Sequence, residues 1–181
     1  MRHILIVPAL ILAAMPLATM QTGAQAGSVD VDIDDCGDDN PDVSIDGCTA
    51  ILRSKQAISA WRLHAFFSRG QAYSKKGLED RAIADFTSAM ALKPELETLV
   101  KLQGSISLSY IGKHLYSESI ASSSKMIELK PNNPDGYQLR GYAYELSGQR
   151  DKAITDYRMT LKLHPDAENV KQALTRLGTT P

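Results

Sequence analysis

The sequence has few of the residues from which enzymes and metal sites are built. Only two cysteines and four histidines occur among the 181 residues, and the histidines are scattered at positions 3, 64, 114 and 164. The chain lacks a His-x-x-x-His pair, a Gly-x-Ser-x-Gly elbow and a glycine-rich phosphate loop. Because no nucleophile has a base beside it, we expect no enzymatic activity, no catalytic residue, no metal site and no cofactor.

The chain also lacks an excess of charge of either sign. It has 20 Lys and Arg residues against 21 Asp and Glu residues, and 43% of its residues are hydrophobic. These values indicate a folded domain and argue against a nucleic-acid partner. The charge is unevenly placed, however, since residues 27–48 contain eight aspartates and no Lys or Arg. We expect this acidic lead to be attracted to the more basic remainder of the chain.

Part of the acidic lead has the spacing of a calcium loop. Asp30, Asp32 and Asp34 match the first, third and fifth positions of such a loop. Asp35 stands where the loop needs glycine, and Pro41 stands where it needs a bidentate glutamate. We therefore interpret the aspartates as a solvated segment and expect no calcium site.

The first 26 residues have the pattern of a cleaved secretory signal. Arg2 and His3 precede an apolar run over residues 4–17, and residues 24–26 read Ala-Gln-Ala, a small-x-small cleavage site. The run is shorter than the ~20 apolar residues that span a bilayer, and prolines interrupt it. We expect a periplasmic or secreted protein with no stable membrane insertion after cleavage.

Export determines how the two cysteines are interpreted. Cys36 and Cys48 both follow the signal, and an oxidising compartment joins an even pair. Their spacing fits neither a structural zinc site nor a Cys-x-x-Cys redox motif. A disulfide between them is the prediction.

The chain repeats itself. Nine positions recur after 71 residues: Gly70, Tyr73, Gly77, Ala82, Ile83, Asp85, Phe86, Leu92 and Pro94 return as Gly141, Tyr144, Gly148, Ala153, Ile154, Asp156, Tyr157, Leu163 and Pro165. A weaker copy lies between them, with Ser107, Tyr110 and His114 at the places of the Gly, Tyr and Gly. A period near 34 residues is typical of stacked helical hairpins.

The spacing within each copy resembles the tetratricopeptide repeat family. The first copy reads Phe66-x2-Arg69-Gly70-x2-Tyr73, followed by an Ala-x3-Phe pair and a closing proline, and the last copy has the same arrangement. The resemblance implies an all-α fold, a short right-handed solenoid of antiparallel helical hairpins. It places repeats at residues 63–96, 100–133 and 134–167.

Both ends of the predicted array carry further helical signals. Asn40 and Pro41 form a helix start, and residues 40–62 look like a degenerate leading repeat. Val170, Ala173, Leu174 and Leu177 form an apolar stripe that predicts a capping helix over residues 168–178.

The family resemblance implies an interaction module, an adaptor or scaffold that binds a protein or peptide segment in a concave groove. Helical spacing from the buried stripes places these residues in the groove: His64, Phe67, Gln71, Lys75, Lys101, Ser105, Leu108, Ile111, Gln138, Leu139, Tyr142 and Glu145. Some of them could instead pack against the adjoining hairpin. The alternative function is a structural subunit of an envelope complex, or a self-associating array, whose groove binds no peptide.

Some family members grip a C-terminal carboxylate with Lys and Asn side chains in this groove. Phe67, Gln71 and Ser105 stand at the places of those residues here, and Asp135 and Leu139 replace the expected bases. We therefore expect no clamp for chaperone tails.

One charged pair recurs between the outer repeats. Arg69 and Asp85 are sixteen residues apart, as are Arg140 and Asp156, and the middle repeat has Ile106 at the arginine's place. We predict an ion pair that ties the two helices of each outer hairpin. The competing hypothesis is that both arginines reach into the groove toward an acidic partner.

Overall fold

The computed structural model describes residues 34–180, and the predicted signal peptide and the first part of the acidic lead lie outside these residues. Within the described range the chain forms eight helices and no strand. The helices are α2 (Pro41–Arg53), α3 (Ser59–Lys75), α4 (Glu79–Ala91), α5 (Leu96–Gly112), α6 (Tyr116–Leu129), α7 (Pro134–Leu146), α8 (Arg150–Leu163) and α9 (Glu168–Arg176). The all-α prediction is confirmed.

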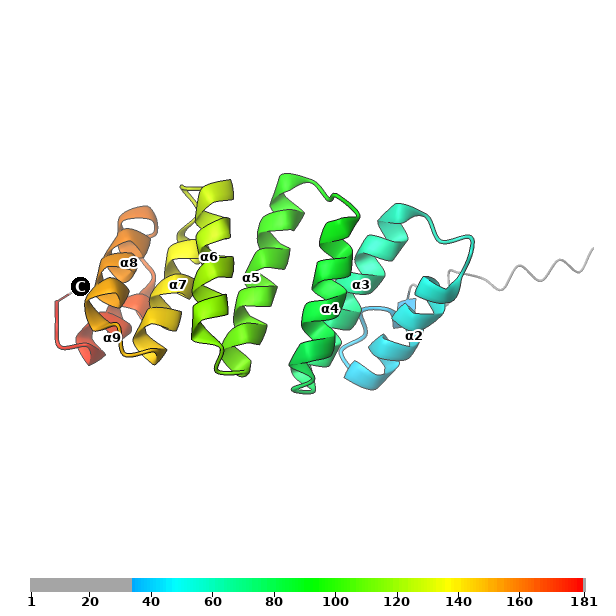
Figure 1. Ribbon diagram of the computed structural model, residues 1–181, viewed down its shortest axis with the longest axis horizontal. Coiled ribbons are helices and arrows are strands. Elements are labelled where there is room, and N and C mark those ends of the chain that lie inside the picture. The colour runs from blue at the N-terminus through cyan, green and yellow to red at the C-terminus, as the bar shows by residue number, and fades with distance from the viewer. Residues whose placement is uncertain (1–33, 181) are drawn as a thin grey trace, which may run out of the picture.

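The helices stand in a row, each packed against the next along the chain (Figure 1). Three hairpins follow one another: α3 with α4, α5 with α6, and α7 with α8. The first helices of the hairpins also contact one another, α3 with α5 and α5 with α7. The fold is therefore a solenoid of helical hairpins, and its first helices share one side.

Small residues allow the helices of the outer hairpins to approach closely. A Cβ atom added to Gly70 would lie 2.6 Å from the ring of Phe86, and one added to Gly141 would lie 3.0 Å from the ring of Tyr157. Each glycine therefore provides the space that an aromatic ring of the second helix fills. Both rings are buried, and this contact sets the spacing of the hairpin.

The middle hairpin fills the same place with hydroxyl groups. Ser107 replaces the glycine, and Ser123 stands at the position of the aromatic residue. The Ser107 hydroxyl lies 2.8 Å from the Oγ atoms of both Ser119 and Ser123, and all three serines are fully buried. Since the large ring is absent, a side chain larger than glycine fits, and hydrogen bonds satisfy its polar atom.

Each outer hairpin contains its own ion pair, with a buried carboxylate, between its two helices. Arg69 Nε donates to Asp85 Oδ2 at 2.7 Å and Arg69 Nη2 donates to Asp85 Oδ1 at 2.9 Å, and Arg140 binds Asp156 with the same two distances. The hydrogen bond to each carboxylate raises the pKa of Arg69 and of Arg140. Both guanidinium groups thus turn to the second helix, and the hypothesis that they reach into the groove is wrong.

The N-terminal end of the array is covered by the chain just before α2. The predicted disulfide is confirmed: Cys36 and Cys48 are joined, with their Cα atoms 4.5 Å apart. Gly47 lets the backbone at Asp35 approach α2, since an added Cβ would lie 2.9 Å from the Asp35 carbonyl carbon. The carbonyl oxygen of Cys36 lies 3.1 Å from His64 Nε2 on α3. This segment therefore covers the start of α3.

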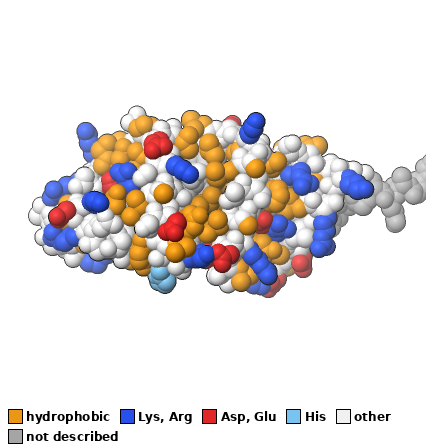
Figure 2. Space-filling model, viewed as in Figure 1, with side chains coloured by type: hydrophobic (Ala, Val, Ile, Leu, Met, Phe, Trp, Pro, Cys, Tyr) orange, Lys and Arg blue, Asp and Glu red, His pale blue; other side chains and the backbone are white. Residues whose placement is uncertain are grey.

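Helix α9 covers the C-terminal end. Val170, Ala173 and Leu174 are buried against α8, in a cluster with Ala153 and Tyr157. Among residues 34–180, no helix is both long and apolar enough to cross a bilayer. On the face shown in Figure 2, basic and acidic side chains are interspersed among hydrophobic ones, without a large field of one sign.

Candidate partner-binding groove

The side formed by the first helices is hollowed by two adjacent cavities. The first lies between α3, α5 and α7 and has a volume of about 520 Å³. Its lining comes from these helices and from one residue of α6: Phe67, Gln71, Lys101, Gly104, Ser105, Leu108, Met126, Asp135, Gln138 and Leu139. The lining has four large apolar side chains, and one Lys and one Asp are its charged residues.

The second cavity lies between α5, α7 and α9 and has a volume of about 420 Å³. Its lining is drawn from these helices and from α8: Leu108, Gln138, Leu139, Tyr142, Tyr157, Asn169, Val170, Gln172, Ala173 and Arg176. Leu108, Gln138 and Leu139 line both cavities. We call the two cavities together the groove, because these shared residues make them continuous.

Two apolar side chains of the groove remain exposed. Leu108 is 52% exposed and Tyr142 is 40% exposed. Both are far more exposed than the core residues of the array. Leu102, for example, lies on the same helix as Leu108 and is fully buried. Exposed apolar area in a concave surface is what a binding site for another molecule requires.

Eight of the twelve residues assigned to the groove from the sequence line one or both cavities. These are Phe67, Gln71, Lys101, Ser105, Leu108, Gln138, Leu139 and Tyr142. The other four, His64, Lys75, Ile111 and Glu145, line neither cavity. His64 instead meets the carbonyl of Cys36 in the N-terminal segment.

Glu145 is held by the end of the array. Arg176 of α9 donates to it from Nε at 2.7 Å and from Nη2 at 3.0 Å, and the Tyr157 hydroxyl donates to Glu145 Oε2 at 2.7 Å. Burial raises the pKa of Glu145, but the hydrogen bonds from Arg176 and Tyr157 outweigh burial and lower it. Burial and the adjacent carboxylate raise the pKa of Tyr157. We call these three residues the clasp, because they join α7, α8 and α9.

The sequence did not reveal that α9 is a wall of the groove. Asn169, Gln172 and Arg176 follow one another at intervals of three and four residues, beside the apolar stripe of α9. This spacing is the signal that could have found them, since it puts polar side chains along one face of a helix. Met126 was missed because it belongs to a second helix. Among residues 34–180, no three His, Cys, Asp or Glu side chains converge to hold a metal ion.

Comparisons with known proteins identify the repeats. The family model described as "Tetratricopeptide repeat" matches residues 63–96 and 134–166. The Hsp70-Hsp90 organizing protein of Triticum aestivum is 33% identical over 107 residues, which cover 59% of this chain and 18% of that protein. The chain spans 18 to 32% of the length of the curated relatives it matches.

Solved structures share the fold. The MamA fragment 41-end from Desulfovibrio magneticus RS-1 has a TM-score of 0.69 at 16% identity, covering 82% of this chain and 80% of that one. The second TPR domain of the human RPAP3 protein, solved in complex with the HSP70 peptide SGPTIEEVD, has a TM-score of 0.59 at 20% identity, covering 68% of this chain and all of that one.

The matched segments are the two hairpins that have the glycine–aromatic contact and the buried ion pair. The middle hairpin has neither feature and keeps the same packing through its serines. The chain therefore contains tetratricopeptide repeats at residues 63–96 and 134–166.

Proposed function

We propose that this chain is an exported interaction module that binds a segment of another protein in the groove. The observation that carries the proposal is the exposed apolar surface of Leu108 and Tyr142, in a concave wall built from three successive first helices. Large apolar side chains in such a position are the usual anchors of a protein interface. The match to the Hsp70-Hsp90 organizing protein and the fold shared with the peptide-bound RPAP3 domain support binding of a protein segment.

The groove differs chemically from one that holds an acidic tail. Phe67, Gln71 and Ser105 line the first cavity at the places where a carboxylate clamp needs Lys and Asn. Asp135 lies in the same wall and would repel a carboxylate. We therefore propose a partner segment that enters the groove with apolar side chains, and we expect the acidic chaperone tails to bind poorly.

The proposal of export is supported by the disulfide. Disulfides persist in oxidising compartments and are rare where thiols are kept reduced. The Cys36–Cys48 bond of the structure agrees with the signal pattern of residues 1–26. Sequencing the N-terminus of the protein purified from its natural host tests this proposal: cleavage predicts a mature chain that begins at Gly27.

Truncation of the two exposed side chains tests binding in the groove. We expect Leu108→Ala and Tyr142→Ala each to weaken partner binding roughly tenfold or more, since truncated anchors often cost about 2 kcal/mol. Helical circular dichroism should not change, because both side chains are already exposed. Leu96→Ala is the matched control, since Leu96 lies on the same helix as Leu108, is 51% exposed and lines neither cavity.

The assay is capture of partner proteins from an extract of the compartment, quantified for each variant. If Leu108→Ala and Leu96→Ala retain the same partners to the same extent, the groove is not the binding surface. Sedimentation of the purified protein checks the alternative of a self-associating array. Self-association that is lost with both groove variants would mean that a second copy of the chain occupies the groove.

A further inference from the structure

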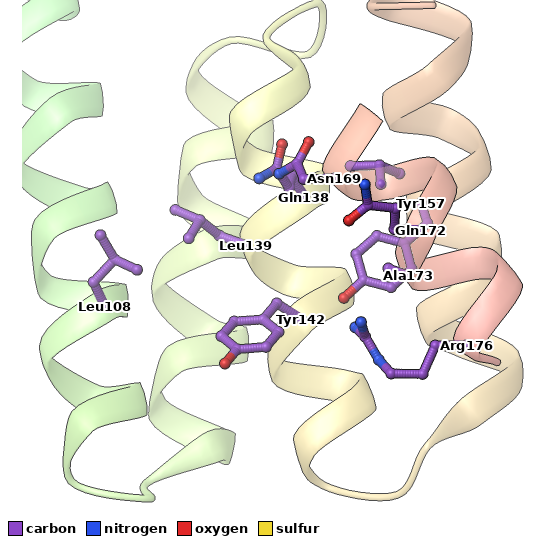
Figure 3. A pocket seen from close by; sticks show the side chains of 10 residues that line it. Leu108, Gln138, Leu139, Tyr142, Tyr157, Asn169, Gln172, Ala173 and Arg176 are labelled. Carbon is purple, nitrogen blue, oxygen red and sulfur yellow. The ribbon is translucent and has the colours of Figure 1, made fainter. Parts of the chain in front are cut away.

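The second cavity is the part of the groove that the capping helix helps to form. Asn169, Gln172 and Arg176 of α9 form one wall, and Leu108 of α5 lies across from them (Figure 3). We infer that this cavity takes an uncharged apolar side chain of the partner segment, whose backbone is bound by the amide side chains around it. The inference rests on the proposed function, because the same segment would pass from the first cavity into the second.

The charges of the cavity favour a neutral occupant. Arg176 is the one charged residue among the side chains that line it in the described part of the chain. Its guanidinium is already engaged by Glu145 through two hydrogen bonds of 2.7 and 3.0 Å. A charged side chain in the cavity would lose hydration without gaining a free counter-charge, and this loss is unfavourable. The clasp therefore selects against charge while it holds α9 in place.

The amides of the cavity fit the backbone of a bound segment. Gln138 and Asn169 lie at one end of the cavity in Figure 3, with Tyr142 and Arg176 at the other. Gln172 joins the first two in the lining. A side-chain amide has donors and an acceptor, so it can pair with both the N–H and the C=O of a peptide. Within residues 34–180, these three side chains make no hydrogen bond with one another or with the backbone.

The shared wall determines how a segment would lie. Leu108 and Leu139 line both cavities and so lie where the two meet. A segment that passes over these two leucines can place one apolar side chain in each cavity. The first cavity has Lys101 and Asp135 in its wall, whereas the second has the paired Arg176. The second cavity is therefore the more selective of the two against charge.

The test is an NMR titration of the full chain, with ¹⁵N-labelled side-chain amides as reporters. The probe is the blocked tripeptide acetyl-Ala-Leu-Ala-amide. Asn169 lines only the second cavity and Gln71 only the first, so each reports on one of them. We expect the Asn169 amide signals to shift with the probe, and acetyl-Ala-Glu-Ala-amide to bind there about tenfold more weakly, equal to about 1.4 kcal/mol.

Two bulky variants provide matched controls. Gln172→Trp narrows the second cavity and Gln71→Trp narrows the first, and both replaced side chains are exposed. We expect the shift at Asn169 to be lost in Gln172→Trp and kept in Gln71→Trp. The natural partner captured in the groove assay should be retained less well by Gln172→Trp.

Four results would overturn the inference. Equal binding of the Leu and Glu probes at Asn169 would show that the cavity does not select against charge. Binding only of acetyl-Ala-Leu-Ala with a free carboxylate would mean that Arg176 leaves Glu145 to bind a chain end. Shifts at Gln71 without shifts at Asn169 would mean that the groove binds the probe in its first cavity but not in its second. The absence of a shift at both residues would also count against the proposed function.

Discussion

At the scale of single residues, the fold depends on two charged pairs buried between the helices of the outer hairpins. Asp156 is only 4% exposed, and its partner Arg140 also donates to Ser124 Oγ at 3.2 Å. Replacing one member of such a pair leaves the other charge uncompensated. We predict that Asp156→Ala lowers the free energy of unfolding by about 3 kcal/mol, measured by urea denaturation followed by circular dichroism.

The middle repeat supplies the control for this prediction, because it has Ile106 and Ser122 at the two places. The double variant Arg140→Ile/Asp156→Ser has the residues of the middle repeat at both places and leaves no charge without its partner. It should therefore be more stable than Asp156→Ala alone. A double variant that is less stable than Asp156→Ala would mean that the pair contributes more through packing and hydrogen bonds than through its charge.

The clasp predicts a dependence of stability on pH. The pKa of Glu145 is lower in the folded chain than the ordinary value near 4.3, so its contribution is present above that pH and is lost as the pH falls through the folded pKa. We predict that Glu145→Gln lowers stability by about 1 kcal/mol at pH 7, since Arg176 is largely exposed. The difference from the natural chain should shrink as the pH falls through the lowered pKa of Glu145, because the protonated carboxyl then resembles the amide.

The measurement is the urea midpoint of both chains from pH 7 to pH 3. The other carboxylates titrate in both chains, so the difference isolates Glu145. A difference that stays constant over this range would show that the charge of Glu145 does not hold α9.

Residue contacts within one repeat could be predicted from the sequence, and contacts to the array ends could not. The two ion pairs followed from a comparison of repeats, because charges present together in two copies and absent from the third are coupled. The partner of Glu145 had no such copy to compare, since α9 follows the last repeat. The helical spacing of residues in α7 predicted that Glu145 lies in the groove. Only the structure shows that Arg176 binds its carboxylate.

At the scale of the helical elements, the turn inside each hairpin has one residue with a left-handed backbone. The outer hairpins have Gly77 at φ +69° and Gly148 at φ +77°, and the middle hairpin has His114 at φ +59°. Residues with a side chain are strained in this conformation. We predict that His114→Gly raises the free energy of unfolding by up to about 1 kcal/mol in urea denaturation.

The reciprocal change tests the same cause. A side chain added at Gly148 would meet no atom within 4 Å, so Gly148→Ala alters only the backbone preference. It should lower stability by about 1 kcal/mol. If His114→Gly instead destabilises the chain, the hydrogen bond of 2.9 Å between the Tyr116 hydroxyl and His114 Nδ1 outweighs the strain.

In the middle hairpin the existence of a repeat was easier to predict than its boundaries or its packing, since α5 begins at Leu96 and the predicted repeat begins at residue 100. Its place in the array followed from its period and from Pro131, which is independent of what fills its core. The serine cluster did not follow, because Ser107, Ser119 and Ser123 carry no hydrophobic signal. Buried hydroxyl groups can replace a glycine–aromatic contact only where they form hydrogen bonds with one another. Whether they do so depends on the spatial arrangement of all three serines.

At the scale of the whole molecule, stacked hairpins contact mainly their neighbours along the chain. Helix α2 packs against α3, and α9 packs against α8. In such an array the stability is the sum of local terms, so a change at one end has little effect on the other. The two ends are also stabilised by different contacts: a disulfide stabilises the N-terminal end, and the clasp stabilises the C-terminal end.

Removal of the disulfide should therefore loosen one end of the array only. Unreduced protein, once denatured, should contain no titratable thiol, because both cysteines are bonded. We predict that Cys36→Ala/Cys48→Ala costs about 3 kcal/mol of local stability, since the bond closes a short loop of chain. Amide hydrogen exchange should then accelerate in α2 and in the first turns of α3, where the N-terminal segment meets His64, and should be unchanged in α8. Equal acceleration in every helix would show that the array unfolds as a single cooperative unit, and the disulfide would then stabilise the groove as a whole rather than its N-terminal edge.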